Sequence, residues 1–278
     1  MRASPMTALI AKEFNETARS RWLAGFVGAF CVLAAVLTVV GSSGSTFGGQ
    51  GFGRTTAALL NLVLLIVPLM GLTAGSLSLA GEKERGTMEF LLSLPLRPRQ
   101  IFWAKFLGSA AALATALGMA FGLIGTGLAL RGGIRQAGVF AACFSATLLL
   151  AAVSLSFGLL ISTRSRKVAG AVGLALLLWF GLILGGDLGL LGTALAVRLP
   201  PGVLLASAWL NPLSLYRLLA IDAASANLDM LGPAGSCAQD VLGSWLRPAA
   251  FAGLAAWLAA SLSAARYLFG RDPLENGR

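Results

Sequence analysis

Six long runs of residues without a charged side chain dominate the sequence. They cover residues 22–53, 55–81, 106–130, 136–163, 168–186 and 248–265. Because about 20 apolar residues in a helix cross the hydrocarbon layer of a membrane, each run is a candidate span. The pattern therefore predicts an all-α membrane protein whose domain, residues 22–270, has six transmembrane helices, at about 22–40, 55–79, 106–130, 137–162, 168–186 and 247–268. We expect these helices to pack closely through small faces such as Gly118, Gly122 and Gly125.

An amphipathic helix is expected before the first span, over residues 1–21. Apolar side chains recur there at every fourth position, at Met6, Ile10, Phe14, Ala18 and Trp22. The other faces carry Lys12, Glu13, Glu16 and Arg19. Such a helix is typical of one that lies on a membrane surface.

The segment 81–105 separates the second and third runs and carries eight charged residues. Within it, residues 87–93 predict a short helix with Met88, Leu91 and Leu92 on one apolar face. Pro95 and Pro98 prevent this helix from merging with the third span. A solvated loop would explain the Lys and Arg residues, but an apolar face fits better into a groove of a partner protein.

The segment 187–246 is mostly apolar but broken by prolines at 200, 201, 212 and 233. Prolines interrupt transmembrane helices, so we expect external helices that rest on or dip into the outer leaflet. A seventh span here would also place the carboxyl-terminal tail, residues 271–278, on the outer side, against its basic residues.

Composition and charge indicate a membrane protein and the orientation of its spans. The chain is 57% hydrophobic and only 12% charged, outside the range of soluble domains. Of the 21 Lys and Arg residues, fifteen fall in segments on one side of the predicted spans and six on the other. The positive-inside rule then puts both termini in the cytoplasm. The net charge of +10 thus reflects membrane topology, and no nucleic-acid partner is expected.

The sequence offers little material for catalysis or for binding a cofactor. It has no histidine, no paired carboxylates within the spans and no phosphate-binding loop of the Gly-x4-Gly-Lys-Ser/Thr type. Cys31 and Cys143 lie within predicted spans and Cys237 stands alone, so no metal site is indicated. We therefore expect a non-catalytic chain that binds no cofactor or metal itself.

Two segments carry a resemblance to a known family. The stretch from Gly81 to Glu89, continued by Leu-Leu-Ser-Leu-Pro at 91–95 and by Lys105, resembles the first cytoplasmic loop of ABC-2 membrane subunits of ATP-binding-cassette (ABC) transporters. The amino-terminal Ala-Lys-Glu-Phe at 11–14 and the external Asn-Pro-Leu-Ser-Leu-Tyr-Arg at 211–217 resemble, within that family, the permeases that serve nitrous oxide reductase maturation. The resemblance implies a type V exporter-like fold in a bacterial inner membrane, with a coupling helix on the cytoplasmic side.

The resemblance also implies partners and contact residues. The partners would be a cytoplasmic ATPase dimer carrying ATP and Mg²⁺, a second copy of this chain, and a periplasmic solenoid-like protein, in a copper-delivery setting. The ATPase contacts would be Glu82, Glu84, Arg85, Gly86, Thr87, Met88, Glu89, Leu91, Leu92, Arg164 and Arg166. The periplasmic contacts would be Asn211, Pro212, Tyr216 and Arg217.

Three alternatives remain open at this point. The chain could be a general ABC-2 exporter permease for a small molecule, a lipid or an ion. It could be a secondary transporter driven by an ion gradient, for which Asp187 would be the carboxylate. It could also be a structural anchor for other membrane proteins.

Overall fold

The computed structural model describes residues 5–43, 51–93, 95–130, 137–195, 208–223 and 243–271. The described residues form helices and connecting turns, without strands. The long helices are α1 (Pro5–Ala18), α2 (Arg21–Ser43), α3 (Gly51–Glu84), α5 (Pro98–Leu130), α6 (Ala137–Arg164), α7 (Val168–Leu195) and α11 (Leu246–Arg271). Shorter elements are α4 (Met88–Ser93), α9 (Pro212–Ala223) and the 3-10 helix η3 (Gly243–Trp245).

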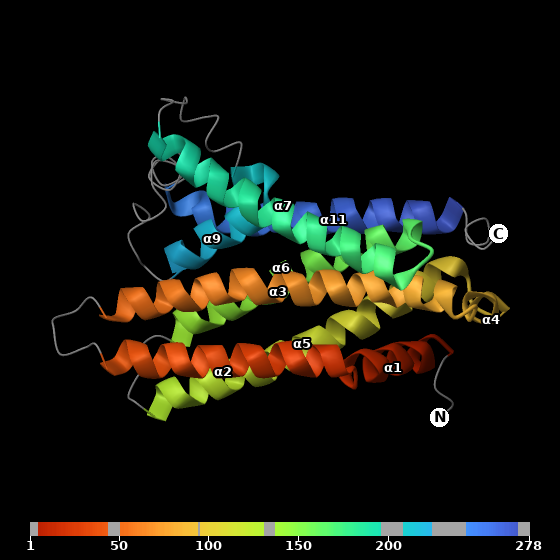
Figure 1. The fold of residues 1–278 in the computed structure, drawn as a ribbon, viewed down its shortest axis with the longest axis horizontal. Coiled ribbons are helices and arrows are strands. Elements are labelled where there is room, and N and C mark those ends of the chain that lie inside the picture. The colour runs from red at the N-terminus through yellow and green to blue at the C-terminus, as the bar shows by residue number, and fades with distance from the viewer. Residues whose placement is uncertain are drawn as a thin grey trace.

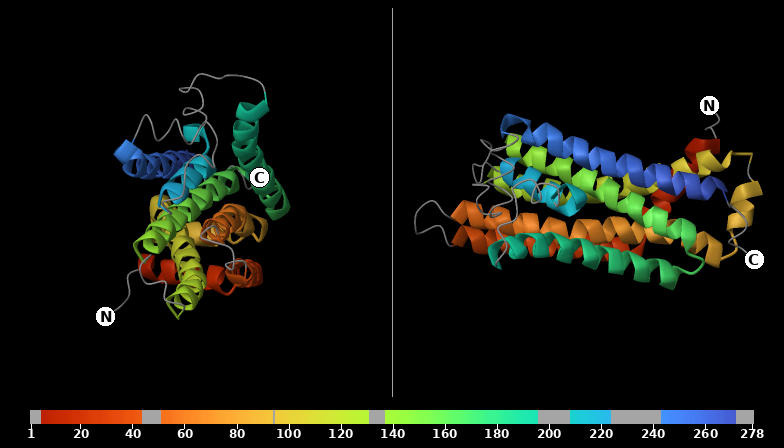
Figure 2. Two further views of the ribbon diagram at one scale, coloured as in Figure 1. Left: turned by 90° about the vertical axis from the view of Figure 1, so that its left-hand side faces the viewer. Right: turned by 90° about the horizontal axis from the view of Figure 1, so that it is seen from above.

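The long helices run roughly parallel to one axis, and the short ones sit at opposite ends of the bundle (Figure 1). Helix α6 packs against α3, α5, α7, α9 and α11. Helix α4 lies across one end, and Figure 2 shows it turned away from the bundle axis. We call this the α4 end. Helix α1 and the last turn of α11 also lie there, whereas α9 lies near the other end.

The length and apolar composition of the helices agree with the predicted class, an all-α membrane protein. In the described part of the chain, α3, α5, α6, α7 and α11 contain segments that are long and apolar enough to span a membrane. Helices α1 and α2, which meet at a bend of 58°, pass the same test when they are counted as one broken span. The all-α membrane fold predicted from the sequence is thereby confirmed.

Helices α3 and α6 approach each other most closely at glycines, which have no side chain to keep the two backbones apart. A Cβ atom on Gly75 would come within 2.3 Å of the Leu155 carbonyl oxygen, and one on Gly158 within 2.4 Å of the Leu72 carbonyl oxygen. Of the small face expected on α5, a Cβ atom at Gly125 would lie 3.2 Å from the Phe140 ring, whereas at Gly118 and Gly122 no described residue comes within 4 Å of such an atom. Small residues thus bring α3 and α6 together, as is usual between membrane helices.

Several helices extend past their expected ends. Helix α5 begins at Pro98 rather than near residue 106, because Pro is tolerated in a first turn and the Gln100 side chain accepts a 2.8 Å hydrogen bond from the Arg97 N–H. Helix α3 continues to Glu84, and α7 runs to Leu195 because no proline stops it before Pro200. These extensions carry charged residues into the bundle, which determines the site described next.

Candidate functional site

The turn from α3 into α4 is a helix cap built around Gly86. Gly86 has a φ of +71°, in the left-handed region that favours glycine. The Thr87 N–H donates to the Glu82 carbonyl at 3.0 Å, and the Gly86 N–H donates to the Lys83 carbonyl at 3.2 Å. This pair of bonds is a Schellman motif, which ends α3 and sends the chain crosswise into α4.

Helix α4 turns its apolar face inward. Met88 is 6% exposed and Leu91 is 3% exposed, and both pack in the hydrophobic core of the bundle. Glu89 is exposed, and Phe90 is exposed to 70%. This chain's own core already covers Met88 and Leu91, which leaves little of either side chain for the expected contact with a partner. The apolar side chain available to a partner is that of Phe90.

Glu82 lies inside the bundle rather than on a surface loop. Its side chain, 4% exposed, sits 3.4 Å from the Nζ atom of Lys105, which is itself 2.8 Å from the Glu13 carboxylate. Lys105 also donates to the Ser78 carbonyl at 3.2 Å, and Thr87 donates its hydroxyl to the Glu82 carboxylate. We call Glu13, Glu82 and Lys105 the Lys105 cluster. It joins α1, α3 and α5, and its burial leaves the Glu82 side chain little surface for an ATPase subunit.

Sequence reasoning missed the Lys105 cluster because it placed Glu13 on a solvent-facing side of the amino-terminal helix. That placement is wrong: the buried residues of α1 are Leu9 and Glu13. The close approach depends on Gly108, since a Cβ atom there would lie 2.6 Å from the Glu13 Cβ. The available signal was that Glu13 and Lys105 both belong to the motifs that carry the family resemblance.

Lys83 and Glu84, the next two residues of α3, reach the turn between α6 and α7. Lys83 Nζ donates to the Thr163 carbonyl at 2.6 Å and, at 3.3 and 3.4 Å, to the carbonyls of Ser162 and Ser165. The Glu84 carboxylate accepts the Val168 N–H at the start of α7. A cation at a helix carboxyl end and an anion at a helix amino end both complement the helix dipoles.

The two segments expected to contact the ATPase are thus joined within this chain. Consecutive residues, Glu82, Lys83 and Glu84, connect the α4 turn to α1 and α5, to the end of α6 and to the start of α7. Arg164 and Arg166 are exposed on the α6–α7 turn, and Arg85 is exposed beside the α4 turn. Leu92 is half-buried. The last turn of α3 therefore links the exposed surface around Phe90 to much of the bundle.

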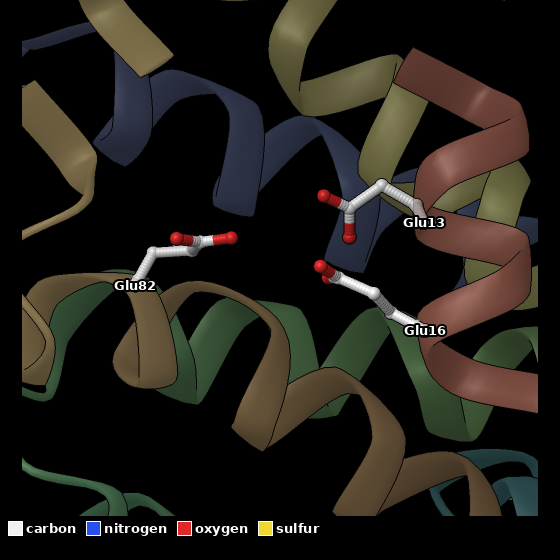
Figure 3. Close-up of side chains that lie close together, drawn as sticks. All are labelled: Glu13, Glu16 and Glu82. Atoms are coloured by element: carbon white, nitrogen blue, oxygen red, sulfur yellow. The ribbon is translucent and has the colours of Figure 1, made fainter. Parts of the chain in front are cut away.

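An open cavity of about 630 Å³ adjoins the Lys105 cluster. Residues from α1, α2, α3, α5 and the first turn of α7 line it. Figure 3 shows the carboxylates of Glu13 and Glu16 from α1 pointing toward Glu82 of α3, and oxygens of the three lie within 4.8 Å of one another. A metal ion could use that spacing. The buried Lys105 ammonium already supplies a cation between Glu13 and Glu82, so the arrangement fits an ion-pair cluster better.

At the other end of the bundle, the residues expected to contact a periplasmic partner face inward. Asn211 caps α9 by accepting the Leu213 N–H at 2.9 Å, and it donates to the Leu182 carbonyl of α7 at 2.6 Å. Tyr216 is fully buried, with its hydroxyl 3.1 Å from that of Thr147 on α6. Pro212 is buried and Arg217 half-buried. Asn211 and Tyr216 thus hold α9 in the bundle, and their burial leaves little of either side chain for the expected periplasmic contact.

Comparison with known proteins identifies the family. The family model described as ABC-2 family transporter protein matches residues 7–274. The chain belongs to the ABC-2 transporter family. Family membership makes it a multi-pass permease subunit of an ABC transporter and implies an ATPase partner. As an ABC-2 permease, it is a membrane component of a larger assembly.

Two relatives share much of the chain's length. The "Probable ABC transporter permease protein NosY" of Pseudomonas aeruginosa is 34% identical over an alignment of 279 positions, which covers 95% of this chain and 97% of the relative. The protein of the same name from Stutzerimonas stutzeri is 32% identical over 215 residues, or 75% of this chain and 78% of the relative. The ABC-2 permease described here is therefore similar to NosY permeases along nearly all of its sequence.

Proposed function

We propose that this permease couples ATP hydrolysis on a partner ATPase dimer to transport, or to conformational signalling toward a periplasmic solenoid-like partner. In this proposal the chain lies in a bacterial inner membrane as a homodimer, with both termini and the α4 end in the cytoplasm. ATP and Mg²⁺ bind on the ATPase subunits, and this chain carries out no chemistry itself. The process served is copper-site maturation of nitrous oxide reductase.

One observation carries the coupling role. Helix α4 lies across the end of the bundle with Phe90 exposed to 70%, while Met88 and Leu91 anchor its other face in the core. An apolar side chain exposed on a rigidly held helix suits insertion into a groove of a partner. Because Glu82, Lys83 and Glu84 are the last residues of α3, just before the turn into α4, a displacement of α4 is transmitted to α1, α5, α6 and α7.

The test of docking is the substitution Phe90→Asp in the chain co-expressed with the ATPase subunit from the same host. A charge at a desolvated contact opposes binding, so we expect at least a tenfold loss of ATPase recovered with the purified permease. Phe90→Trp should preserve recovery. Ser93→Asp is the matched control, since it adds the same charge to an exposed position on α4. Unchanged recovery with Phe90→Asp would refute docking through this helix.

A companion variant separates docking from folding. Met88→Asp places a carboxylate in the core, so we expect poor insertion or early thermal unfolding rather than a selective loss of the ATPase. Phe90→Asp should leave the melting temperature in detergent within the range of the wild-type protein. A large drop with Phe90→Asp would show that Phe90 supports the fold instead.

The similarity to NosY permeases favours the maturation role over a general exporter. Deletion of the gene for this permease in its host should yield nitrous oxide reductase that lacks copper at one of its sites. Reintroduction of the wild-type gene should restore that copper. A reductase with its full copper content in the deletion strain would favour the general exporter. The gradient-driven alternative depended on Asp187, whose side chain lies outside the described part of the structure.

A further inference from the structure

Helix α1 packs closely against α5 and buries one charged side chain in that contact. Among its residues only Leu9 and Glu13 are buried, while Ile10 and Phe14 are half-buried. Its main neighbour is α5, and it bends away from α2 by 58°. Glu13 is held by Lys105 at 2.8 Å, with side chains 5% and 1% exposed. The buried carboxylate of α1 thus has its counter-ion on α5, inside the contact between the two helices.

The same lysine holds the α4 turn. Lys105 Nζ lies 3.4 Å from Glu82, and Glu82 accepts the Thr87 hydroxyl and N–H through its carboxylate and carbonyl oxygens. One buried ammonium therefore lies between two carboxylates, one on α1 and one at the end of α3, while the more exposed Lys12 and Arg85 add positive charge beside Glu82 at 3.6 and 4.0 Å. Without it, two buried negative charges would face each other, which would push the two helices apart.

We propose that Lys105 is a positioning residue that makes α1 move together with the α3–α4 turn. Motion of the coupling helix α4 is then passed to the amino-terminal helix as well as to the spans. This inference rests on the proposed coupling function. Lys105 works by holding Glu13 and Glu82 in one rigid unit during the nucleotide cycle. The cavity of about 630 Å³ beside the cluster is lined by both α1 and the end of α3, so it gives these helices room to shift relative to each other once the lysine is lost.

The experiment measures distances between spin labels by pulsed electron paramagnetic resonance, in the complex with the ATPase subunit in lipid nanodiscs. Labels are placed on exposed positions at Ala8 in α1, Ser93 in α4 and Ala264 in α11. The native cysteines, Cys31, Cys143 and Cys237, are first replaced by serine. Distances are compared without nucleotide and with ATP plus vanadate.

In the wild-type background we expect the Ala8–Ser93 distance to stay constant while both distances to Ala264 shift with nucleotide. In Lys105→Met, the Ala8–Ser93 distance should become broad and nucleotide-dependent. Glu13→Gln weakens the cluster from the α1 side and should act in the same direction, which keeps the test available if Lys105→Met does not fold. Lys105→Arg keeps the charge and should restore the constant distance.

Lys12→Met is the matched control. Lys12 also lies near Glu82, at 3.6 Å, but its side chain is 46% exposed, so water screens the charge that is lost. The constant Ala8–Ser93 distance should survive this substitution. An effect equal to that of Lys105→Met would overturn the special role of the buried lysine.

Failure of this inference is distinguishable from failure of the proposed function. If neither distance to Ala264 responds to ATP in the wild-type complex, the coupling function is wrong. If those distances respond but the Ala8–Ser93 distance changes in the wild type, or stays constant in both Lys105→Met and Glu13→Gln, only the positioning role is wrong. A loss of thermal stability without a change in these distances would show a purely structural role.

Discussion

Gly86 sets the direction in which the chain leaves α3. A side chain at this position would have open space, since nothing lies within 4 Å of a Cβ atom built there. The requirement is therefore on the backbone, whose φ of +71° is unfavourable for residues with a Cβ atom. The same residue type in a straight helix would have no such role.

The prediction at the residue scale is that Gly86→Ala destabilises the protein by about 1 kcal/mol. Gly86→Asn should cost less, because asparagine adopts left-handed conformations more readily than alanine. Thermal unfolding of the purified chain in detergent, compared at one protein concentration, checks both values. Equal stability of the alanine variant and the wild type would mean that the turn adopts another conformation.

Lys83 and Glu84 act differently, because each bonds to a backbone group that lies far away along the chain. Each caps an end of a helix more than 70 residues away along the chain, at Thr163 and at Val168. From the sequence, both belong to a charge run that sets membrane topology. Their second use depends on the packing of α3 against α6, which no local pattern reveals.

At the scale of helices, the α3–α6 pair is the element on which the α4 end is built. Ser162 of α6 accepts the N–H groups of Leu79 and Ala80 at 3.0 and 2.7 Å, and it donates to the Ser76 carbonyl at 2.8 Å. A hydroxyl has the two lone pairs and one proton that this arrangement uses. The contact locks the two helices in register just before the last turn of α3.

The prediction at this scale concerns Gly75. Gly75→Ala forces a Cβ atom against the Leu155 backbone, so we expect a loss of about 1–3 kcal/mol and weaker ATPase-coupled activity. The matched control is Gly118→Ala on α5, where the added methyl group meets nothing within 4 Å. Helix propensity alone makes that change neutral or stabilising, by up to about 1 kcal/mol.

Melting temperatures of the two glycine variants, measured side by side, check this prediction. A Gly75→Ala variant as stable as Gly118→Ala would mean that α3 and α6 separate enough to accept the methyl group. The close approach would then be no requirement of the fold. If Gly75→Ala keeps the melting temperature of the wild type but loses ATPase-coupled activity, the substitution acts on the α4 end rather than on stability.

At the scale of the whole molecule, the two ends of the bundle differ in what they present. The α4 end carries the exposed residues Arg85, Phe90, Arg164 and Arg166. At the opposite end, η3 leads directly into α11, and its last residue, Trp245, is 72% exposed. An aromatic residue at the beginning of a membrane helix is typical of a membrane–water interface.

The topology prediction uses single cysteines in the background without native cysteines. Ser93→Cys at the α4 end should react with a membrane-impermeant maleimide only after cells are permeabilised. Trp245→Cys should react in cells whose outer membrane alone has been opened. The reverse pattern would place the α4 end outside the cytoplasm and would exclude contact with a cytoplasmic ATPase.

The sequence by itself determined the class of fold and the general position of the site. Charge-free runs long enough to cross a membrane predict helices without reference to any neighbour, because each helix satisfies its own backbone. The Gly-Thr pair at 86–87 and the prolines at 95 and 98 mark a break and a short helix for equally local reasons. The family resemblance added the identity of the partner.

Only the tertiary structure decided which side chains are available and which are internal. Met88 and Leu91 are as apolar as Phe90, yet the first two are buried and the third is exposed, because the direction of α4 depends on the cap at Gly86. Glu13, Glu82 and Lys105 are far apart in sequence and meet because Gly108 lets α1 approach α5 closely. A period in the sequence places residues on a face of a helix, whereas the neighbour that covers this face follows from long-range packing.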